Sequence, residues 1–176
     1  MLTNPLNLSS ICATQYIEHF YSFFKRDFID SDTYLERIYI NPKKDELDDG
    51  KQKVFWHLTT RTDEVWKQNG KLRQKVKERF PDLNRARRIC WIKEIIENYD
   101  HNDIKLFYAK HHSSKIRLYL WAYDYDFLVI LQKLGRSESI LVTSFYITHD
   151  GKRKELDELY NGYNDQNSDL SNCEWF

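Results

Sequence analysis

The sequence predicts an α+β domain in which a helix packs on a four-stranded antiparallel sheet, with an N-terminal helix and short extra strands. Two observations support this class. Apolar residues over 89–96 recur at helical spacing, and after residue 103 the pattern changes to alternation over four segments joined by short turns. The length of 176 residues, with 15% aromatic residues, five Gly and three Pro, is typical of one compact domain. We expect this domain over 1–163, followed by an acidic, loosely ordered tail over 164–176.

The first half of the chain predicts a helix and two strands. Ser9 and Ser10 can cap a helix that runs to about Arg26, because its apolar residues share one face. Residues 35–40 predict a short strand, 45–50 an acidic turn and 53–59 a second strand. In that second strand, alternation puts His57 on the same side as Phe55. Residues 62–80 are polar and predict a loop with a short exposed helix.

The second half predicts the helix and the sheet. Pro81 and Asp82 open a helix that ends near Asn98. Segments 104–110, 115–121, 127–133 and 139–148 predict four strands, and their short connections favour antiparallel pairing because parallel strands need a long crossover. A final helix is expected over 152–163.

Charge and composition exclude several classes of function. Lys and Arg total 27 against 27 acids, a balance that argues against a protein that coats DNA. No apolar run is long enough to cross a bilayer, and there is no signal peptide, so we expect no membrane partner and a cytoplasmic location. Three scattered cysteines, no ligand spacing and no glycine-rich phosphate loop predict no metal and no cofactor.

The charge is concentrated locally. Residues 67–88 carry nine Lys/Arg against two acids, and His57 lies just upstream. An imidazole near guanidinium groups can bind and cleave a phosphodiester, with His57 as general acid/base and Arg85 and Arg88 holding the phosphate. Cations at a helix N-terminus are unfavourable unless an anion is bound there. A half-buried structural histidine and solvent-facing arginines explain the same residues equally well.

Other polar and aromatic residues are weaker candidates. Thr143 and Tyr146, on the last predicted strand, are candidates to orient a phosphate. Arg61, Arg117 and Trp121 are candidates for substrate binding, with Trp121 offering a surface on which a base could stack. A helix packed on the same strand face is the alternative interpretation.

Three stretches together resemble a known superfamily: Phe55-Trp56-His57-Leu58, the helix segment from Pro81 to Ile96, and residues 126–131 leading to 141–146. They resemble phage- and prophage-encoded members of the barnase–EndoU–colicin–RelE-like superfamily, which includes metal-independent ribonucleases and toxins. The resemblance covers about 54–160 and implies a nuclease-like core there. By position it implies that His57, Arg85, Arg88, Thr143 and Tyr146 form an RNA-cleaving site. Residues 62–79 are longer and more basic than the usual link in that family, and the acidic tail is extra.

The leading expectation is therefore a metal-independent endoribonuclease in which the RNA 2′-hydroxyl attacks the phosphodiester. The alternative is a non-enzymatic phage accessory protein that binds a host protein or RNA. Separate basic and acidic segments favour a protein partner or inhibitor bound through either segment. A third possibility is that the acidic tail covers the basic site.

Overall fold

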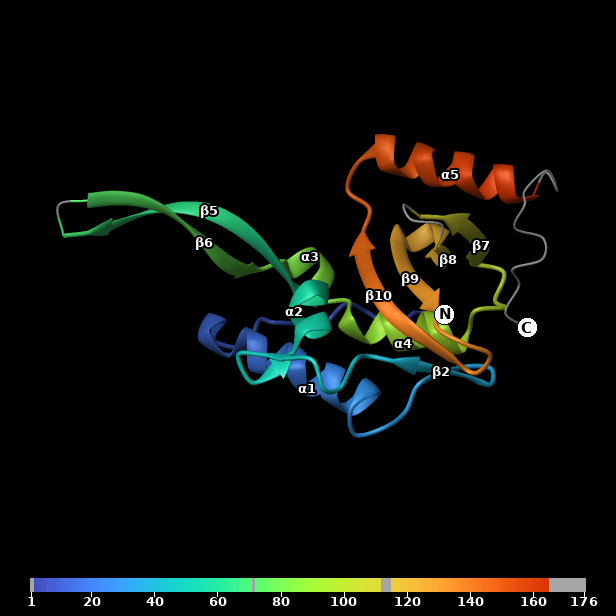
Figure 1. Cartoon of the computed structure of the whole chain (residues 1–176), viewed down its shortest axis with the longest axis horizontal. Coiled ribbons are helices and arrows are strands. Elements are labelled where there is room, and N and C mark those ends of the chain that lie inside the picture. The colour runs from blue at the N-terminus through green and yellow to red at the C-terminus, as the bar shows by residue number, and fades with distance from the viewer. Residues whose placement is uncertain (1, 71, 112–114, 165–176) are drawn as a thin grey trace.

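The computed structural model describes residues 2–70, 72–111 and 115–164, and their fold is α+β (Figure 1). The main sheet has six strands in the order β1-β2-β10-β9-β8-β7 and curls into a half-barrel. The expectation of a four-stranded antiparallel sheet is therefore wrong, because two more strands extend the sheet and one of them runs parallel to its neighbour.

Four consecutive strands form an antiparallel meander within this sheet. They are β7 (Ile104–Lys110), β8 (Ile116–Ala122), β9 (Phe127–Lys133) and β10 (Glu138–Tyr146). A short 3₁₀ turn joins β8 to β9 and ends at Asp126, which has a left-handed backbone. The register of β10 on β9 shifts between Leu141 and Thr143, where a β-bulge inserts Val142.

The two extra strands come from the predicted segment 35–40. β1 (Tyr34–Leu35) and β2 (Ile38–Asn41) form a hairpin about Glu36, whose φ is 52°. β2 then pairs in parallel with β10, Tyr39 opposite Glu138. Alternation identifies a strand but not its partner, so this pairing of distant segments has no signature in the sequence. A second small hairpin joins β3 (Leu47–Asp48) to β4 (Lys51–Gln52).

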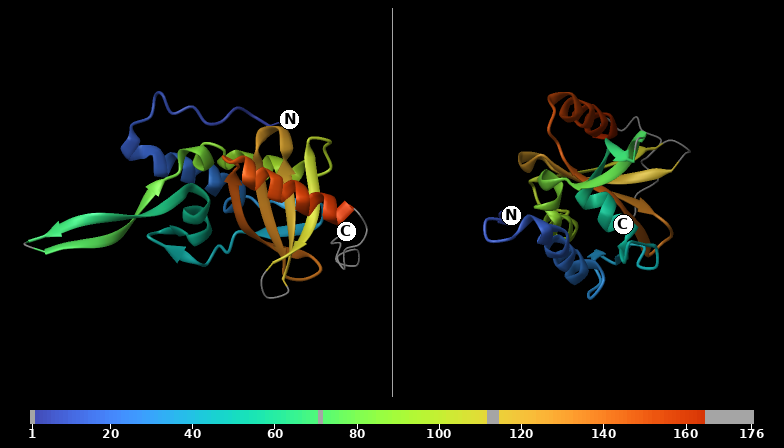
Figure 2. Two further views of the ribbon diagram at one scale, coloured as in Figure 1. Left: turned by 90° about the horizontal axis from the view of Figure 1, so that it is seen from above. Right: turned by 90° about the vertical axis from the view of Figure 1, so that its left-hand side faces the viewer.

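Helices cover both faces of the sheet (Figure 2). On one face lie α1 (Tyr16–Phe28) and α4 (Ile89–Glu97), and the fully buried Phe20, Phe24 and Ile92 join the sheet residues there. On the other face lies α5 (Asp150–Asn164), whose Leu156 packs with a smaller cluster that includes Trp121. The apolar residues of the sheet are therefore buried on both faces.

Three predicted helical or strand assignments need correction. Residues 53–59 are not a strand but a helix, α2 (Lys53–Thr59). The expected helix 82–98 is two helices, α3 (Leu83–Ala86) and α4, separated at Arg87 and Arg88. Near the N-terminus, a 3₁₀ turn (Ala13–Gln15) precedes α1, so the helix begins later than Ser9 and Ser10 suggest.

The most visible departure from expectation is a two-stranded arm, β5 (Thr60–Asn69) and β6 (Leu72–Pro81), which projects from the body (Figures 1 and 2). Residues 62–80 were expected to form a loop with a short helix, and that expectation is wrong. Beyond Thr60, none of the arm residues whose burial is described is buried. The segment has polar residues on both faces, so its sequence lacks the apolar alternation of a half-buried strand.

Two further expectations concern the chain ends and the membrane. The predicted acidic tail lies outside the described residues except for Asn164, which ends α5. Across the parts of the chain that are described, no helix has the length and apolar character needed to cross a bilayer.

Shortening the arm tests whether it contributes to the folded core. Replacing residues 64–77 with Asn-Gly would join Asp63 to Glu78, which are paired across the arm, through a two-residue turn that favours a hairpin. Because none of the excised residues whose burial is described is fully buried, we expect the melting temperature to stay within a few degrees of the parent. Thermal unfolding followed by circular dichroism measures this. A fall of more than about 10 °C would show that the arm supports the core.

Candidate functional site

The candidate site lies where α2, α3 and the end of β10 meet. His57 lies on α2 with an exposed side chain, whereas Phe55 and Leu58 beside it are fully buried. The helix, and not strand alternation, therefore decides the direction of His57. Its ring is at the protein surface, where a ligand can reach it.

Side chains donate hydrogen bonds to carbonyls in the C-terminal turn of α2. Thr59 Oγ1 donates to the Phe55 carbonyl at 2.8 Å, and Thr60 Oγ1 donates to the Trp56 carbonyl at 2.6 Å. Arg85 Nη2 donates to the His57 carbonyl at 2.7 Å. A cation at this end of a helix is favourable because the carbonyls carry partial negative charge.

Arg85 also bonds the sheet. Its Nε and Nη2 donate to the Ser144 carbonyl of β10 at 3.1 and 2.8 Å. One guanidinium thus joins the C-terminus of α2 to the last strand. The argument that arginines here need a bound anion fails for Arg85, because its charge is stabilised by carbonyls of another helix and a strand. Burial lowers the pKa of Arg85, but an arginine stays charged at neutral pH.

Arg87 has a structural role at the break between α3 and α4. Its Nε donates to the Leu6 carbonyl at 2.7 Å, and the Leu6 amide donates back to the Arg87 carbonyl at 2.7 Å. The N-terminal segment is held against α4 in the same way, through Trp91 Nε1 and the Thr3 carbonyl at 2.7 Å.

Arg88 is the arginine that remains available to an anion. Its guanidinium carbon lies 4.1 Å from the centre of the Tyr146 ring and 5.0 Å from that of Trp91, and Nη1 donates to the Asn84 carbonyl at 2.6 Å. Its buried Nε finds no partner among the described residues. Stacking on two aromatic rings fixes the plane of the guanidinium while leaving part of its donor capacity unused.

The pKa of His57 is lowered mainly because neighbouring atoms withdraw water from part of the ring, and secondly because the Arg85 charge repels a proton. Both effects disfavour the imidazolium. The ring is therefore neutral at pH 7, which is the form that accepts a proton.

The structure brings together some predicted site residues and separates others. Arg85 contacts the backbone carbonyls of His57 and Ser144, and Arg88 stacks on Tyr146, two residues further along β10. These contacts do not include one between the His57 ring and Arg88 or Tyr146. Thr143 and Tyr146 lie on opposite faces of the sheet. After the bulge, Thr143 pairs with Ile130, which belongs to the cluster under α5. Tyr146 pairs with Phe127, which belongs to the core under α1 and α4.

The candidates for substrate binding are also dispersed. Trp121 is fully buried beneath α5 and has no surface on which a base could stack. Arg117 lies on the same strand, and its buried Nε has no partner among the described residues. Arg61 is at the root of the arm and pairs with Asp63 at 2.9 Å.

Sequence reasoning missed a hollow of about 490 Å³ that begins at Tyr146. Its lining includes His149 and Arg153, which follow β10 and begin α5, and Arg153 forms a short ion pair with Asp126. The one sign of this hollow in the sequence was a histidine, His149, three residues after the candidate Tyr146.

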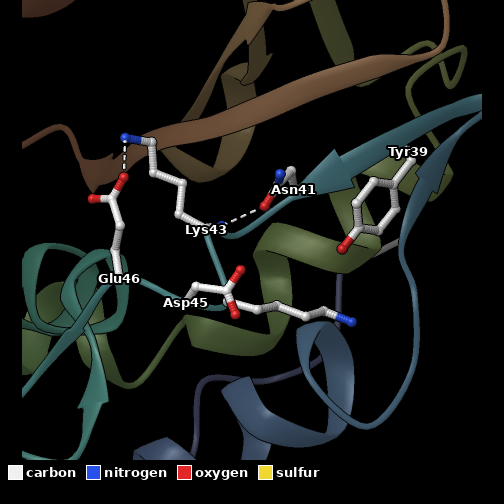
Figure 3. A pocket seen from close by; sticks show the side chains of 6 residues that line it. Tyr39, Asn41, Lys43, Asp45 and Glu46 are labelled. Atoms are coloured by element: carbon white, nitrogen blue, oxygen red, sulfur yellow. Dashed lines mark hydrogen bonds and ion pairs between the residues drawn. The ribbon is translucent and has the colours of Figure 1, made fainter.

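A second hollow, about 370 Å³, lies at the end of β2 (Figure 3). There Lys43 pairs with Glu46 and Lys44 with Asp32, so its charges compensate one another.

No group of three or more His, Cys, Asp or Glu side chains that could hold a metal occurs within residues 2–70, 72–111 and 115–164. Comparisons with protein-family models, curated proteins and solved structures found no significant match. The functional argument therefore depends on the geometry of the site, and the family resemblance stays a prediction.

Arg85 should matter for stability as well as for the site. We expect Arg85→Ala to lower the free energy of unfolding by about 2–3 kcal/mol, because two carbonyls lose a charged donor. Arg37→Ala, at an exposed turn residue, is the control and should change stability by less than about 0.5 kcal/mol. Urea unfolding measures both. Equal effects of the two substitutions would contradict the role given to Arg85.

Proposed function

We propose that the protein is a metal-independent endoribonuclease whose site is formed by His57, Arg88 and Tyr146. The observation that carries the proposal is an exposed imidazole whose pKa is lowered, on a helix that Arg85 joins to the strand bearing Tyr146. A neutral imidazole is a general base, and a stacked arginine is a phosphate ligand.

In the proposed reaction, His57 takes the proton of an RNA 2′-hydroxyl, and the 2′-oxygen attacks the adjacent phosphorus. The bond from phosphorus to the 5′-oxygen breaks, that oxygen takes a proton from water, and the His57 imidazolium gives its proton to the hydroxide that remains. The products are a 2′,3′-cyclic phosphate and a 5′-hydroxyl. Arg88 stabilises the negative charge that develops on the phosphorane oxygens, and the Tyr146 hydroxyl orients the phosphate. Arg85 is a positioning residue, since its donors bond carbonyls.

A second candidate function is RNA binding without cleavage. It is favoured because Arg85 and Arg87 donate hydrogen bonds to carbonyls of distant segments. Among the arginines of residues 85–88, all within the described chain, Arg88 alone donates only to a nearby carbonyl, that of Asn84. A site with one available cation binds phosphate but stabilises a phosphorane less well than two would.

Removal of the imidazole distinguishes the two functions. We expect His57→Ala to lower the cleavage rate of a single-stranded RNA at least about 100-fold, the usual contribution of a general base. His101→Ala, at an exposed histidine in a turn after α4, is the control and should keep the parent rate. Gel analysis of the product ends measures cleavage, and mass spectrometry identifies the cyclic phosphate. Equal rates for the parent and His57→Ala would remove His57 from the mechanism.

The pH dependence should follow the His57 ring. The pKa of His57 lies below the ordinary value of about 6.5. The ring therefore stays neutral, and able to act as a base, until the pH falls below its own lowered pKa. The unfolded chain binds more protons than the folded chain in that range, so stability also falls as the pH decreases. We expect the acid limb of the rate profile to have its midpoint below pH 6.5 and to match the ring titration measured by NMR, assigned with His57→Ala. A midpoint above pH 7 would contradict the lowered pKa.

A further inference from the structure

The two faces of the arm, β5 and β6, differ in charge. Residues at alternate positions of a strand share a face, and the register pairs Trp66 with Lys75 and Glu64 with Lys77. One face, here called the basic face, therefore carries a row of four cations against the single acid Glu64: Arg73, Lys75, Lys77 and Arg79.

The opposite face of the same arm is electrically balanced. Arg61 and Lys67 lie there with Asp63 and Glu78, and both cations are ion-paired with these acids. Val65, Val76 and Phe80 also belong to this face and are half-buried. The row of cations comes from alternation within β6, where the four cations occupy every second position, and the register adds Glu64 and Trp66 of β5 to the same face.

The cations of the basic face are exposed and only partly compensated. Lys75 pairs with Glu64 at 3.2 Å, and Arg79 pairs with Asp48 of β3 at 2.5 Å. No ion pair of Arg73 or Lys77 occurs within residues 2–70, 72–111 and 115–164. Residues two apart on a strand lie about 6.8 Å from each other, so the row extends over roughly 20 Å.

An exposed tryptophan lies within this row. Trp66 is 54% exposed, with Arg73 5.1 Å and Lys75 5.6 Å from its ring centre. A large aromatic ring this exposed is not part of a buried core. Beside a row of cations, it is suited to stack on a base while the cations bind phosphates.

The arm emerges from the candidate site. It begins directly after α2, which bears His57, and returns to α3, which bears Arg85. The Asp82 amide donates to the Thr59 carbonyl at 2.8 Å, which closes the root of the arm, while ten residues per strand give it a length of roughly 33 Å. A strand bound along the arm would therefore lead to the site.

We propose that the basic face of the arm binds single-stranded RNA through its phosphates and stacks one base on Trp66. The choice of RNA over DNA rests on the proposed function, whereas the binding rests on the arm alone. A single strand is favoured over a duplex because only an unpaired base can stack on an exposed ring.

Binding is measured separately from cleavage with a fluorescein-labelled 20-nucleotide 2′-O-methyl oligouridylate, which has no free 2′-hydroxyl to react. Anisotropy at several salt concentrations gives the affinity and its salt dependence. Two double variants remove the same charge from opposite faces of the arm: Arg73→Gln/Lys77→Gln and the control Arg61→Gln/Lys67→Gln. Trp66→Ala and the control Leu72→Ala, at an exposed residue of the opposite face, test stacking.

We expect Arg73→Gln/Lys77→Gln to reduce the slope of log affinity against log salt by about 1.4, since each phosphate contact with a single strand contributes about 0.7. The opposite-face control should leave the slope within about 0.3 of the parent, because its cations are already paired. Trp66→Ala should weaken binding about 10-fold, and Leu72→Ala should not.

Several results would overturn the inference. Equal effects of the two double variants would mean that only total charge matters. Equal or tighter binding of a 20-bp DNA duplex, or of a 20-residue oligoglutamate, would indicate a duplex or an acidic protein as the partner. If the parent cleaves RNA and the arm variants bind normally, the arm inference fails and the nuclease stands. If the parent binds through the arm but cleaves nothing, the nuclease fails and the arm inference stands.

Discussion

The guanidinium of Arg85 is the interaction on which the rest of the structure depends. It is half-buried and donates to the C-terminus of α2 through the His57 carbonyl and to β10 through the Ser144 carbonyl. Two segments that are 87 positions apart in the chain are thereby held against each other. Nη2 donates to both carbonyls and Nε adds a second bond to Ser144, so the planar guanidinium makes three hydrogen bonds in one fixed orientation. The contact holds the C-terminus of α2, while the burial of Phe55 and Leu58 turns His57 outward.

The same junction explains how a long arm can be inserted into the chain without disturbing the site. The arm separates α2 from α3 in the sequence, but its first and last residues pair as Thr60 and Pro81, so the chain returns to where it left. Arg85 then reaches α2 as if the arm were absent. The arm buries almost nothing, so its sequence is not constrained by packing and can be chosen for its charge. This combination is typical of elements that carry binding and not stability.

A neutral total charge conceals two different uses of positive charge in this protein. Arg85 and Arg87 bond carbonyls and hold segments of the fold together. The cations of β6 face solvent in a single row. Local fields depend on where charges lie and not on their sum, so a balanced protein can still present a phosphate-binding surface. The arm uses the exposed cations, whereas Arg88 of the proposed site is half-buried and stacked on Tyr146.

The sequence by itself determined part of the local structure. The meander strands, the final helix and the α+β class follow from alternation and helical spacing, since burial imposes those periods directly. It also singled out His57, Arg85, Arg88 and Tyr146, and the fold joins Arg85 to His57 and Arg88 to Tyr146 by contacts. Only the tertiary structure decided the parallel pairing of β2 with β10, the helical state of residues 53–59, and the arm. A seven-residue apolar segment fits a helix or a strand equally well, and an exposed ribbon has no buried face to impose a pattern. The partners of a strand or of an arginine are chosen by distant segments, which no local period records.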